Sequence, residues 1–290
     1  MNDYVLALLL GIIEGLTEFL PVSSTAHLRI AEAALGVDLT SGYWKMFTIV
    51  IQLGAILCLP IYFRQRILSF LKTFPKGARG DRTELTHPLT LVLLAFLFTA
   101  VPAFLLTKII GKNLESIVVM GTSLILGGVL MWVIDVLYER GFFFPGRRTE
   151  DLEQVNPGQS IFIGLAQVAA AVFPGVSRSM ATIAAGQLSG MSRTSALEFS
   201  FFLSIPTMAA ATLYDLLKSL RHKAGEHAMG AAPQSAEQWI ALLIGFVVSF
   251  IVAYAVVAWF MSWVRKRGFV PFAIYRILFG IIVLAWALNQ

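Results

Sequence analysis

The chain of 290 residues is 57% apolar and only 13% charged, a composition typical of polytopic helical membrane proteins that excludes an ordinary soluble domain. Its net charge of +5 comes mainly from cations in the hydrophilic breaks between apolar runs, the usual signal that orients membrane helices, so we expect no nucleic-acid partner. Cys58 is the single cysteine, which excludes an intramolecular disulfide and a thiolate metal cluster.

Six apolar runs are each close to the ~20 residues needed to cross a bilayer. They lie near residues 44–63, 89–110, 117–138, 195–217, 238–262 and 271–288. Two further segments, 4–35 and 158–189, are apolar but are interrupted by PVSS and PGVS. The expected fold is therefore all-α, a polytopic membrane protein with six transmembrane helices and two re-entrant pairs of broken helices.

The two interrupted segments resemble one another, which predicts an internal repeat. At an offset of 153 residues the sequence pairs Gly11 with Gly164, Glu14 with Gln167, Pro21 with Pro174 and Ser24 with Ser177. If each half contains one re-entrant pair and three spans, the odd number of crossings makes the second half enter the membrane from the opposite side. We therefore expect residues 1–150 and 151–290 to form an inverted-topology repeat in one membrane domain, with its two breaks meeting near the midplane.

The loops carry an uneven distribution of Lys and Arg. Thirteen of these residues fall on one side of the predicted spans and six on the other. The positive-inside rule makes the first side cytoplasmic and puts both termini outside. The hydrophilic stretches 64–88, 139–157 and 218–237 are expected to be solvated connections.

The first interrupted segment contains two acidic residues, in EGLTEFLPVSSTAH. Glu14 and Glu18 are four residues apart, which places both carboxylates on one face of a helix. A charged side chain inside a membrane costs about 2.5 to 3.5 kcal/mol or more, so such residues usually serve a site. We expect both glutamates to be catalytic and to bind a divalent metal ion.

A break follows these carboxylates. Pro21 ends the helix, and Ser23, Ser24 and Thr25 are natural caps for the next one. His27 lies just inside that second helix, so the turn is expected to bring hydroxyls and an imidazole toward the carboxylates.

The second segment reads PGVSRSMAT and carries an arginine at its break. Pro174 and Gly175 interrupt the helix, and Ser177 and Ser179 can cap the next one. Free N–H groups at a helix N-terminus bind anions, and Arg178 adds a planar cationic fork that suits phosphate oxygens. The alternative, that Arg178 only pairs with a glutamate, does not conflict with phosphate binding.

Together the two breaks predict one pocket with a cationic and an acidic half. Hard oxygen ligands favour Mg²⁺ or Ca²⁺ over zinc. Ser24 and His27 can supply a nucleophile and a base for phosphoryl transfer. The residues expected to bind substrate are Ser23, Thr25, Gln167, Gly175, Ser177, Ser179 and Thr182.

These motifs resemble those of a known family. GIIEGLTEFLPVSSTAH is similar to the first signature, and PGVSRSMAT to the second signature, of the bacterial undecaprenyl-diphosphate phosphatases of the bacitracin-resistance type. The likeness continues through FTIVIQLGAIL and GMSRTSALEFSFFLSIP and covers nearly the whole chain. Met180 and Ala26 stand where the signatures usually or often have glycine, which changes bulk near the helix starts and leaves the reacting groups in place.

The resemblance implies hydrolysis of the terminal phosphate of undecaprenyl diphosphate, which recycles the carrier lipid for peptidoglycan and other envelope polymers. It implies a divalent cation, a polyprenyl diphosphate as substrate, membrane lipids as surroundings, and an active site facing the periplasmic side of the inner membrane. It also assigns function to Glu14, Glu18, His27 and Arg178, with Ser24 as a proposed nucleophile. The residues themselves leave water or His27 as alternative nucleophiles.

Two other functions are alternatives to this one. A phosphatidic-acid phosphatase would need His and Asp where this chain has Ala184 and Leu188. A lipid-phosphate flippase or anion transporter would use the same broken helices and Arg178, but a carrier of anions alone gains nothing from two carboxylates beside its ligand.

Three features stay open on sequence grounds. Glu198 either lies at an interface or pairs with a nearby cation, and Arg276 either snorkels to the surface or binds a lipid phosphate. Gly127 and Gly128 can pack helices within one chain as readily as between two, which leaves a homodimer open.

Overall fold

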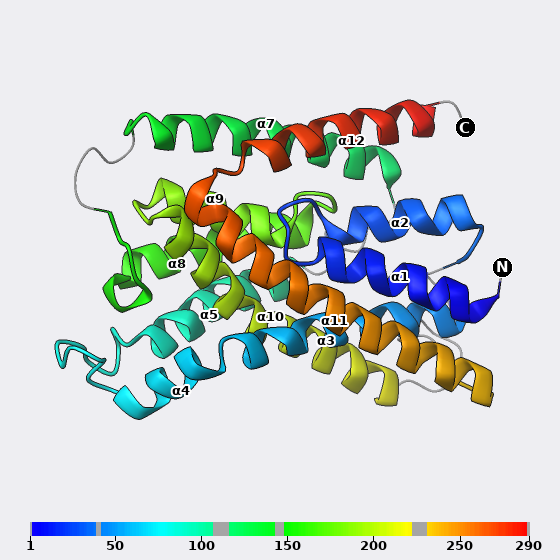
Figure 1. The fold of residues 1–290 in the computed structure, drawn as a ribbon, viewed down its shortest axis with the longest axis horizontal. Coiled ribbons are helices and arrows are strands. Elements are labelled where there is room, and N and C mark those ends of the chain that lie inside the picture. The colour runs from blue at the N-terminus through cyan, green and yellow to red at the C-terminus, as the bar shows by residue number, and fades with distance from the viewer. Residues whose placement is uncertain (1, 39–41, 107–115, 143–147, 222–230, 289–290) are drawn as a thin grey trace.

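A computed structural model describes residues 2–38, 42–106, 116–142, 148–221 and 231–288, apart from the side chains of 215–221. The described chain is a bundle of helices with both termini at the same end (Figure 1). In chain order the helices are α1 (Asp3–Thr17), α2 (Ser24–Leu35), α3 (Gly42–Tyr62), α4 (Arg64–Thr73), α5 (Pro88–Leu105), α7 (Ile117–Glu139), the short 3₁₀ helix η1 (Leu152–Gln154), α8 (Pro157–Val172), α9 (Arg178–Leu188), α10 (Arg193–Arg221), α11 (Ala236–Lys266) and α12 (Val270–Leu288).

Six of these helices are long and apolar enough to cross a membrane, which confirms the predicted all-α, multi-pass fold. They are α3, α5, α7, α10, α11 and α12, and their bounds lie within a few residues of the predicted spans. The predicted end of the second span, at residue 110, lies outside the described residues. Pro60, Pro102 and Pro206 all lie inside spanning helices, and proline is tolerated in such helices of membrane proteins.

The two interrupted segments each form a pair of short helices, α1 with α2 and α8 with α9. In both pairs the second helix begins directly after a serine in the left-handed region, Ser23 and Ser177, each with φ 73°. The structure therefore pairs Ser23 with Ser177, and the predicted pairing of Ser24 with Ser177 was wrong by one residue. The reason is Gly175, which adds one residue between Pro174 and the following valine in the second break.

Helices from the first and second parts of the chain pack against one another. α1 packs against α11, α8 packs against α5, and α7 packs against α12. A Cβ atom at Gly11 would lie 2.8 Å from the Gly245 carbonyl oxygen of α11, and one at Gly164 would collide with the Ala95 carbonyl oxygen of α5. The division into residues 1–150 and 151–290 with inverted topology, and the re-entrant placement of the short pairs, remain predictions.

Gly127 and Gly128 lie on the face of α7 that packs against α12 within the same chain. A Cβ atom at Gly128 would lie 2.9 Å from the Ala273 carbonyl oxygen, and one at Gly127 would meet the side chains of Arg276 and Met180. The two glycines therefore pack helices within one chain. The homodimer stays a prediction, and these glycines give it no support.

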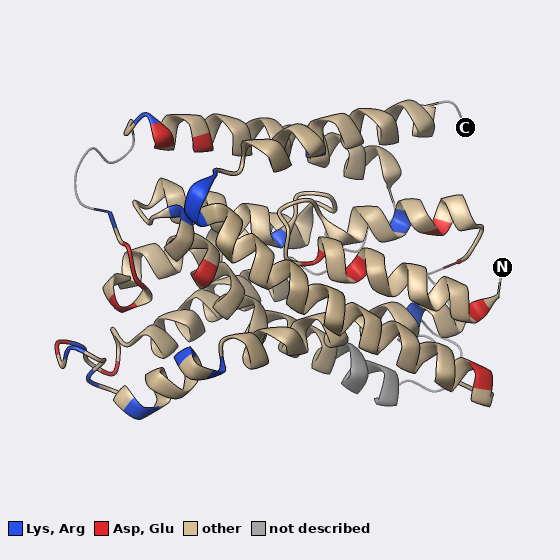
Figure 2. Ribbon diagram, in the orientation of Figure 1, with Lys and Arg blue, Asp and Glu red and all other residues tan. Residues whose placement is uncertain are grey.

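Most of the Lys and Arg residues in the described part of the chain lie toward the end of the bundle opposite the termini (Figure 2). The stretch 64–88, expected to be a solvated connection, begins with α4, which is mostly exposed and buries Phe70. Arg66 of this helix pairs with Asp151 at 2.6 Å and with Glu198 at 3.2 Å. Of the two alternatives for Glu198, the structure thus selects pairing with a cation.

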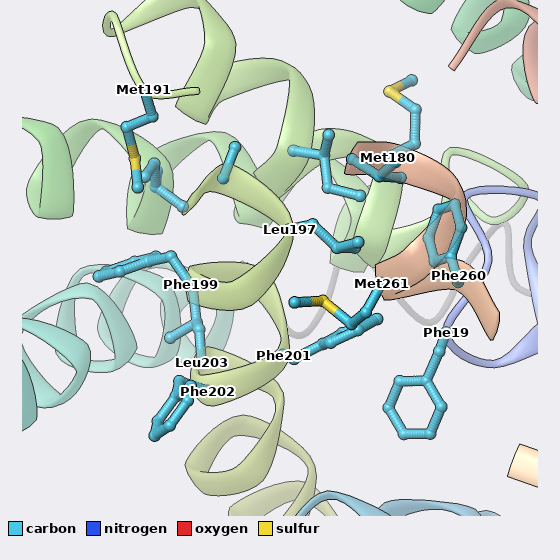
Figure 3. Packing of buried hydrophobic residues seen from close by; sticks show 14 of the residues in the cluster. Phe19, Met180, Met191, Leu197, Phe199, Phe201, Phe202, Leu203, Phe260 and Met261 are labelled. Atoms are coloured by element: carbon cyan, nitrogen blue, oxygen red, sulfur yellow. The ribbon is translucent and has the colours of Figure 1, made fainter. Parts of the chain in front are cut away.

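The core of the bundle holds the first break in place. Phe19, next to Glu18, is fully buried and meets Phe201 of α10 edge to face, with ring centroids 5.4 Å apart. Figure 3 shows Phe19 beside the side chains of α10 and of Phe260 and Met261 from α11. This packing holds in place the backbone next to Glu18, an acidic residue of the site.

Candidate active site

Three adjoining hollows lie around the two breaks. The acidic hollow has a volume of about 130 Å³ and is lined by Glu14, Ser24, Thr25, Leu28, Arg29, Thr48, Ile49 and Gln52. The central hollow, of about 200 Å³, lies between the breaks and shares Ser24, Thr25 and Gln52 with the first. An apolar groove of about 620 Å³ runs between α5, α8 and α10 and shares Ala170 and Arg178 with the central hollow.

Glu18, Ser24 and Arg178 form one hydrogen-bonded group in the wall of the central hollow. The Ser24 hydroxyl donates to Glu18 Oε2 at 2.6 Å, and Arg178 Nη2 donates to Glu18 Oε1 at 3.1 Å. Arg178 Nη1 also donates to the Ser204 hydroxyl. Ser24 and Arg178 are the first residues of α2 and α9, so the N-termini of both helices meet at this hollow.

Glu14 is buried at 1% exposure, and neither of its carboxylate oxygens has a hydrogen-bond partner. It lines the acidic hollow, one turn before Glu18 on the same buried face of the chain. A buried carboxylate without donors is costly, because burial removes its hydration and nothing replaces it. This carboxylate therefore fits a bound cation, with the Gln52 amide and the Ser24 hydroxyl as further oxygen donors in the same lining.

His27 lies beside the site, outside the linings of the three hollows, and both of its ring nitrogens have partners. Nδ1 is 2.7 Å from the Ser23 carbonyl oxygen, and Nε2 is 2.7 Å from the Tyr275 hydroxyl. Because a carbonyl can only accept, Nδ1 carries the proton. The ring also stacks on Phe279, with centroids 4.3 Å apart.

The remaining residues expected to bind substrate divide into two sets. Ser23, Thr25, Gly175 and Ser177 line the central hollow. Gln167 lines the apolar groove, where its amide nitrogen donates to Thr207 at 3.2 Å. Ser179 and Thr182 are buried outside the described linings, and the Thr182 hydroxyl lies 2.7 Å from that of Ser200.

Sequence reasoning missed several polar residues of the site. Gln52 lines both polar hollows, and Ser204 holds Arg178, yet each lies in a helix predicted only as a membrane span. The sequence feature that could have identified these two residues is a polar amide or hydroxyl side chain within an apolar run. Arg29 lines the acidic hollow and pairs with Glu32 at 2.8 Å, and its motif position gave no indication of that role.

The apolar groove had no sequence signal at all. Its walls are mostly alanine and phenylalanine, among them Ala100, Ala103, Ala210 and Ala211. Small side chains on three helices leave the space, so the groove exists only where α5, α8 and α10 come together. Arg178 lies at its polar end, where the groove joins the central hollow.

The fold and the site define a class, namely a polytopic membrane protein in which two helix breaks bring a carboxylate, a hydroxyl and an arginine into one buried polar centre beside an apolar groove. The family model described as bacitracin resistance protein BacA matches residues 7–282, and the chain belongs to this family.

Curated relatives match along almost the full length. A protein of Koribacter versatilis named undecaprenyl-diphosphatase is 67% identical over 293 residues, covering 100% of both chains. One of Paramagnetospirillum magneticum named undecaprenyl-diphosphatase 2 is 41% identical, covering 94% of this chain and 95% of its own. One of Caldanaerobacter subterraneus subsp. tengcongensis named undecaprenyl-diphosphatase is 38% identical, covering 98% and 96%.

Proposed function

We propose that the protein is an undecaprenyl-diphosphate phosphatase, which removes the terminal phosphate of the C55 diphosphate and returns the carrier lipid for peptidoglycan and other envelope polymers. The observation that carries the proposal is the contact of Ser24 with Glu18, and of Glu18 with Arg178, at the meeting point of two helix N-termini. The 67% identity with a relative of that name supports the same activity.

The diphosphate lies in the central hollow in this proposal. Arg178 and the N-termini of α2 and α9 offer cationic and N–H groups for phosphate oxygens. Thr25 and Ser177 add groups from the same lining. The polyprenyl tail follows the apolar groove, which begins at Arg178 and is walled by α5, α8 and α10.

The family resemblance implies a divalent cation, Mg²⁺ or Ca²⁺, and the free carboxylate of Glu14 supports a site for it. Glu14 and Glu18, with Gln52 and the Ser24 hydroxyl, are the residues that would hold the ion. When bound, such an ion neutralises charge on phosphate oxygens. Among the described residues no group of three or more His, Cys, Asp and Glu side chains forms a metal cluster, so the ion would need ligands from the substrate or from water.

The reaction proposed for the chain's own residues has two steps. Ser24 Oγ attacks the terminal phosphorus, its proton passes to the Glu18 oxygen that it already contacts, and the bond between that phosphorus and the bridging oxygen breaks. Undecaprenyl phosphate leaves, with Arg178 holding the charge that develops on the phosphate oxygens. Water then attacks the phosphorus of the phosphoserine, the bond from phosphorus to Ser24 Oγ breaks, and the proton on Glu18 returns to Oγ as inorganic phosphate is released.

His27 contributes to the proposed site through its hydrogen bond to Ser23. Its Nδ1–H holds the carbonyl of Ser23, the residue that caps α2 in a left-handed conformation directly before Ser24. A direct exchange of protons with Ser24 would require the imidazole to leave Tyr275 and Phe279. We therefore assign His27 to the positioning of the nucleophile.

We also propose the cell inner membrane as the location, with the site facing the periplasmic side. The basic end of the bundle would lie in the cytoplasm, and the end that bears both termini outside, as the positive-inside rule requires (Figures 1 and 2).

The test is phosphate release from a C55 polyprenyl diphosphate by purified protein in detergent, with and without a chelator. Wild type is compared with Glu18→Gln, Arg178→Ala and the control Arg66→Ala, which alters an arginine at the basic end of the bundle. Metal-dependent release that collapses in the first two variants and persists in the control supports the proposal. No release from folded wild type overturns it, and flipping of the lipid diphosphate in vesicles would then test the transport alternative.

A further inference from the structure

Arg276, in the middle of α12, is completely buried and is the largest fully buried side chain among the described residues. It therefore reaches neither the membrane surface nor a lipid phosphate, the two roles that the sequence left open. No salt bridge joins it to a carboxylate among the described residues. A buried guanidinium without a counter-ion is costly and needs its hydrogen bonds satisfied.

Main-chain carbonyls accept from both terminal nitrogens, whereas Nε is buried without a partner, and two of these carbonyls belong to the two breaks. Arg276 Nη1 donates to the Pro21 oxygen at 2.9 Å, and Nη2 donates to the Gly175 oxygen at 2.9 Å. Nη2 also lies 3.3 Å from the Ser123 oxygen of α7. One planar side chain thus spans both interruptions and the helix behind them.

The two bound carbonyls occupy equivalent positions. Pro21 comes two residues before Ser23, and Gly175 comes two residues before Ser177. Both serines have φ 73°, a conformation that costs a residue with a Cβ atom about 1 to 2 kcal/mol and persists only when its surroundings impose it. Arg276 therefore anchors the backbone just where each strained cap is set.

We infer that Arg276 is a positioning residue that holds the two breaks, and with them Ser24 and Arg178, in register across the central hollow. The expected effect on kinetics rests on the proposed phosphatase function. The expected effect on the structure of the two breaks rests on the hydrogen bonds alone. It acts through the backbone, because its guanidinium contacts carbonyls of the breaks and is absent from the described lining of the hollow.

Gly127 provides the space that the guanidinium needs. A Cβ atom there would collide with Arg276 Nη2 and lie 2.7 Å from the Met180 methyl carbon. Gly121 lies on the same α7–α12 interface, but a Cβ atom there would meet Leu284 and the Gly280 carbonyl. Gly127→Ala therefore disturbs the arginine and Gly121→Ala disturbs only the helix packing, which makes the two a matched pair.

The test compares wild type, Arg276→Lys, Arg276→Met, Gly127→Ala and Gly121→Ala by hydrogen exchange and by kinetics. In Arg276→Met and Gly127→Ala we expect the amides of residues 22–26 and 176–180 to exchange at least about tenfold faster, in both breaks together. We expect kcat to fall by up to about 100-fold, since small misplacements of reacting groups carry such losses, while KM stays within about threefold. Arg276→Lys retains the charge but lacks the planar guanidinium, so its exchange rates and kcat are expected to lie between those of wild type and Arg276→Met.

Unchanged exchange in the breaks, or faster exchange in only one of them, would overturn the inference, and so would an equal effect of Gly121→Ala. If Arg276→Met fails to fold, the two glycine variants decide the question by themselves. Absence of phosphatase activity in wild type would remove the proposed function, whereas the exchange measurement still decides whether Arg276 holds the breaks.

Discussion

Ser23 and Ser177 adopt the same left-handed backbone conformation, φ 73°, each directly before the second helix of a broken pair. Their side chains differ, because the Ser177 hydroxyl accepts from the Met180 N–H at 3.3 Å, whereas the Ser23 side chain forms no capping bond. The same backbone device is therefore supported by a side-chain cap in the second break and by His27, through the Ser23 carbonyl, in the first.

This difference predicts unequal effects on thermal stability. Ser177→Ala should lower the unfolding temperature, because loss of a cap costs about 1 kcal/mol, and Ser23→Ala should leave it nearly unchanged. Ser23→Gly should raise it, since glycine adopts positive φ without a steric cost of about 1 to 2 kcal/mol. Thermal unfolding in one detergent checks all three, and equal losses in the two alanine variants would contradict the assignment.

If Glu14 binds the metal ion, the unfolding temperature should depend on that ion. Wild type should unfold at a higher temperature when Mg²⁺ or Ca²⁺ is added, because an ion that binds only the folded state stabilises it. Glu14→Gln should abolish this shift and, in chelator, should be at least as stable as wild type, because its carboxylate has no partner to lose. A full metal-induced shift in Glu14→Gln would place the ion elsewhere.

Ser24 and Thr25 form a matched pair for the identity of the nucleophile. Both line the two polar hollows, but only the Ser24 hydroxyl contacts Glu18. Ser24→Ala should lose activity by about 1,000-fold or more, while Thr25→Ala should lose about tenfold at most. Mass spectrometry of quenched wild type should find phosphate on Ser24, and near-normal turnover by Ser24→Ala would pass the role to water.

Variants of His27 and Tyr275 test separately the hydrogen bonds of the two imidazole nitrogens, Nδ1 and Nε2. His27→Phe removes the bond to the Ser23 carbonyl, and we expect kcat to fall by about 10- to 100-fold through loss of positioning. Tyr275→Phe leaves that bond in place and should change kcat by less than about threefold. An equal loss in both variants would show that the Nε2 side takes part in the reaction.

The apolar groove predicts a dependence on the length of the lipid. Ala210→Phe narrows the groove and should raise KM for the C55 diphosphate by about tenfold, because buried apolar area contributes about 25 cal/mol per Å². A diphosphate with a short prenyl chain should be hydrolysed by the variant as by wild type. Ala255→Phe, at an exposed position of α11, serves as the control, and an equal effect there would refute the assignment of the groove.

The class of fold could be predicted from the sequence alone, and so could the two ionisable residues that the structure joins. Apolar runs near the bilayer length identified six spans, since a membrane requires each crossing helix to satisfy its own backbone hydrogen bonds. Ionisable residues are expensive in such a setting, so Glu18 and Arg178 stood out, and the structure joins them at 3.1 Å across 160 residues.

Only the tertiary structure decided how these groups are held. The contact of His27 with Tyr275 and the groove between three helices depend on distances between segments far apart in the chain. The contacts of Ser24 with Glu18 and of His27 with Ser23 are local, but they depend on the backbone conformation of the break. Arg276 is the clearest case, because its partners are backbone carbonyls of two distant breaks. Main-chain oxygens occur at every position, so no pattern of residue types could identify the two that it binds.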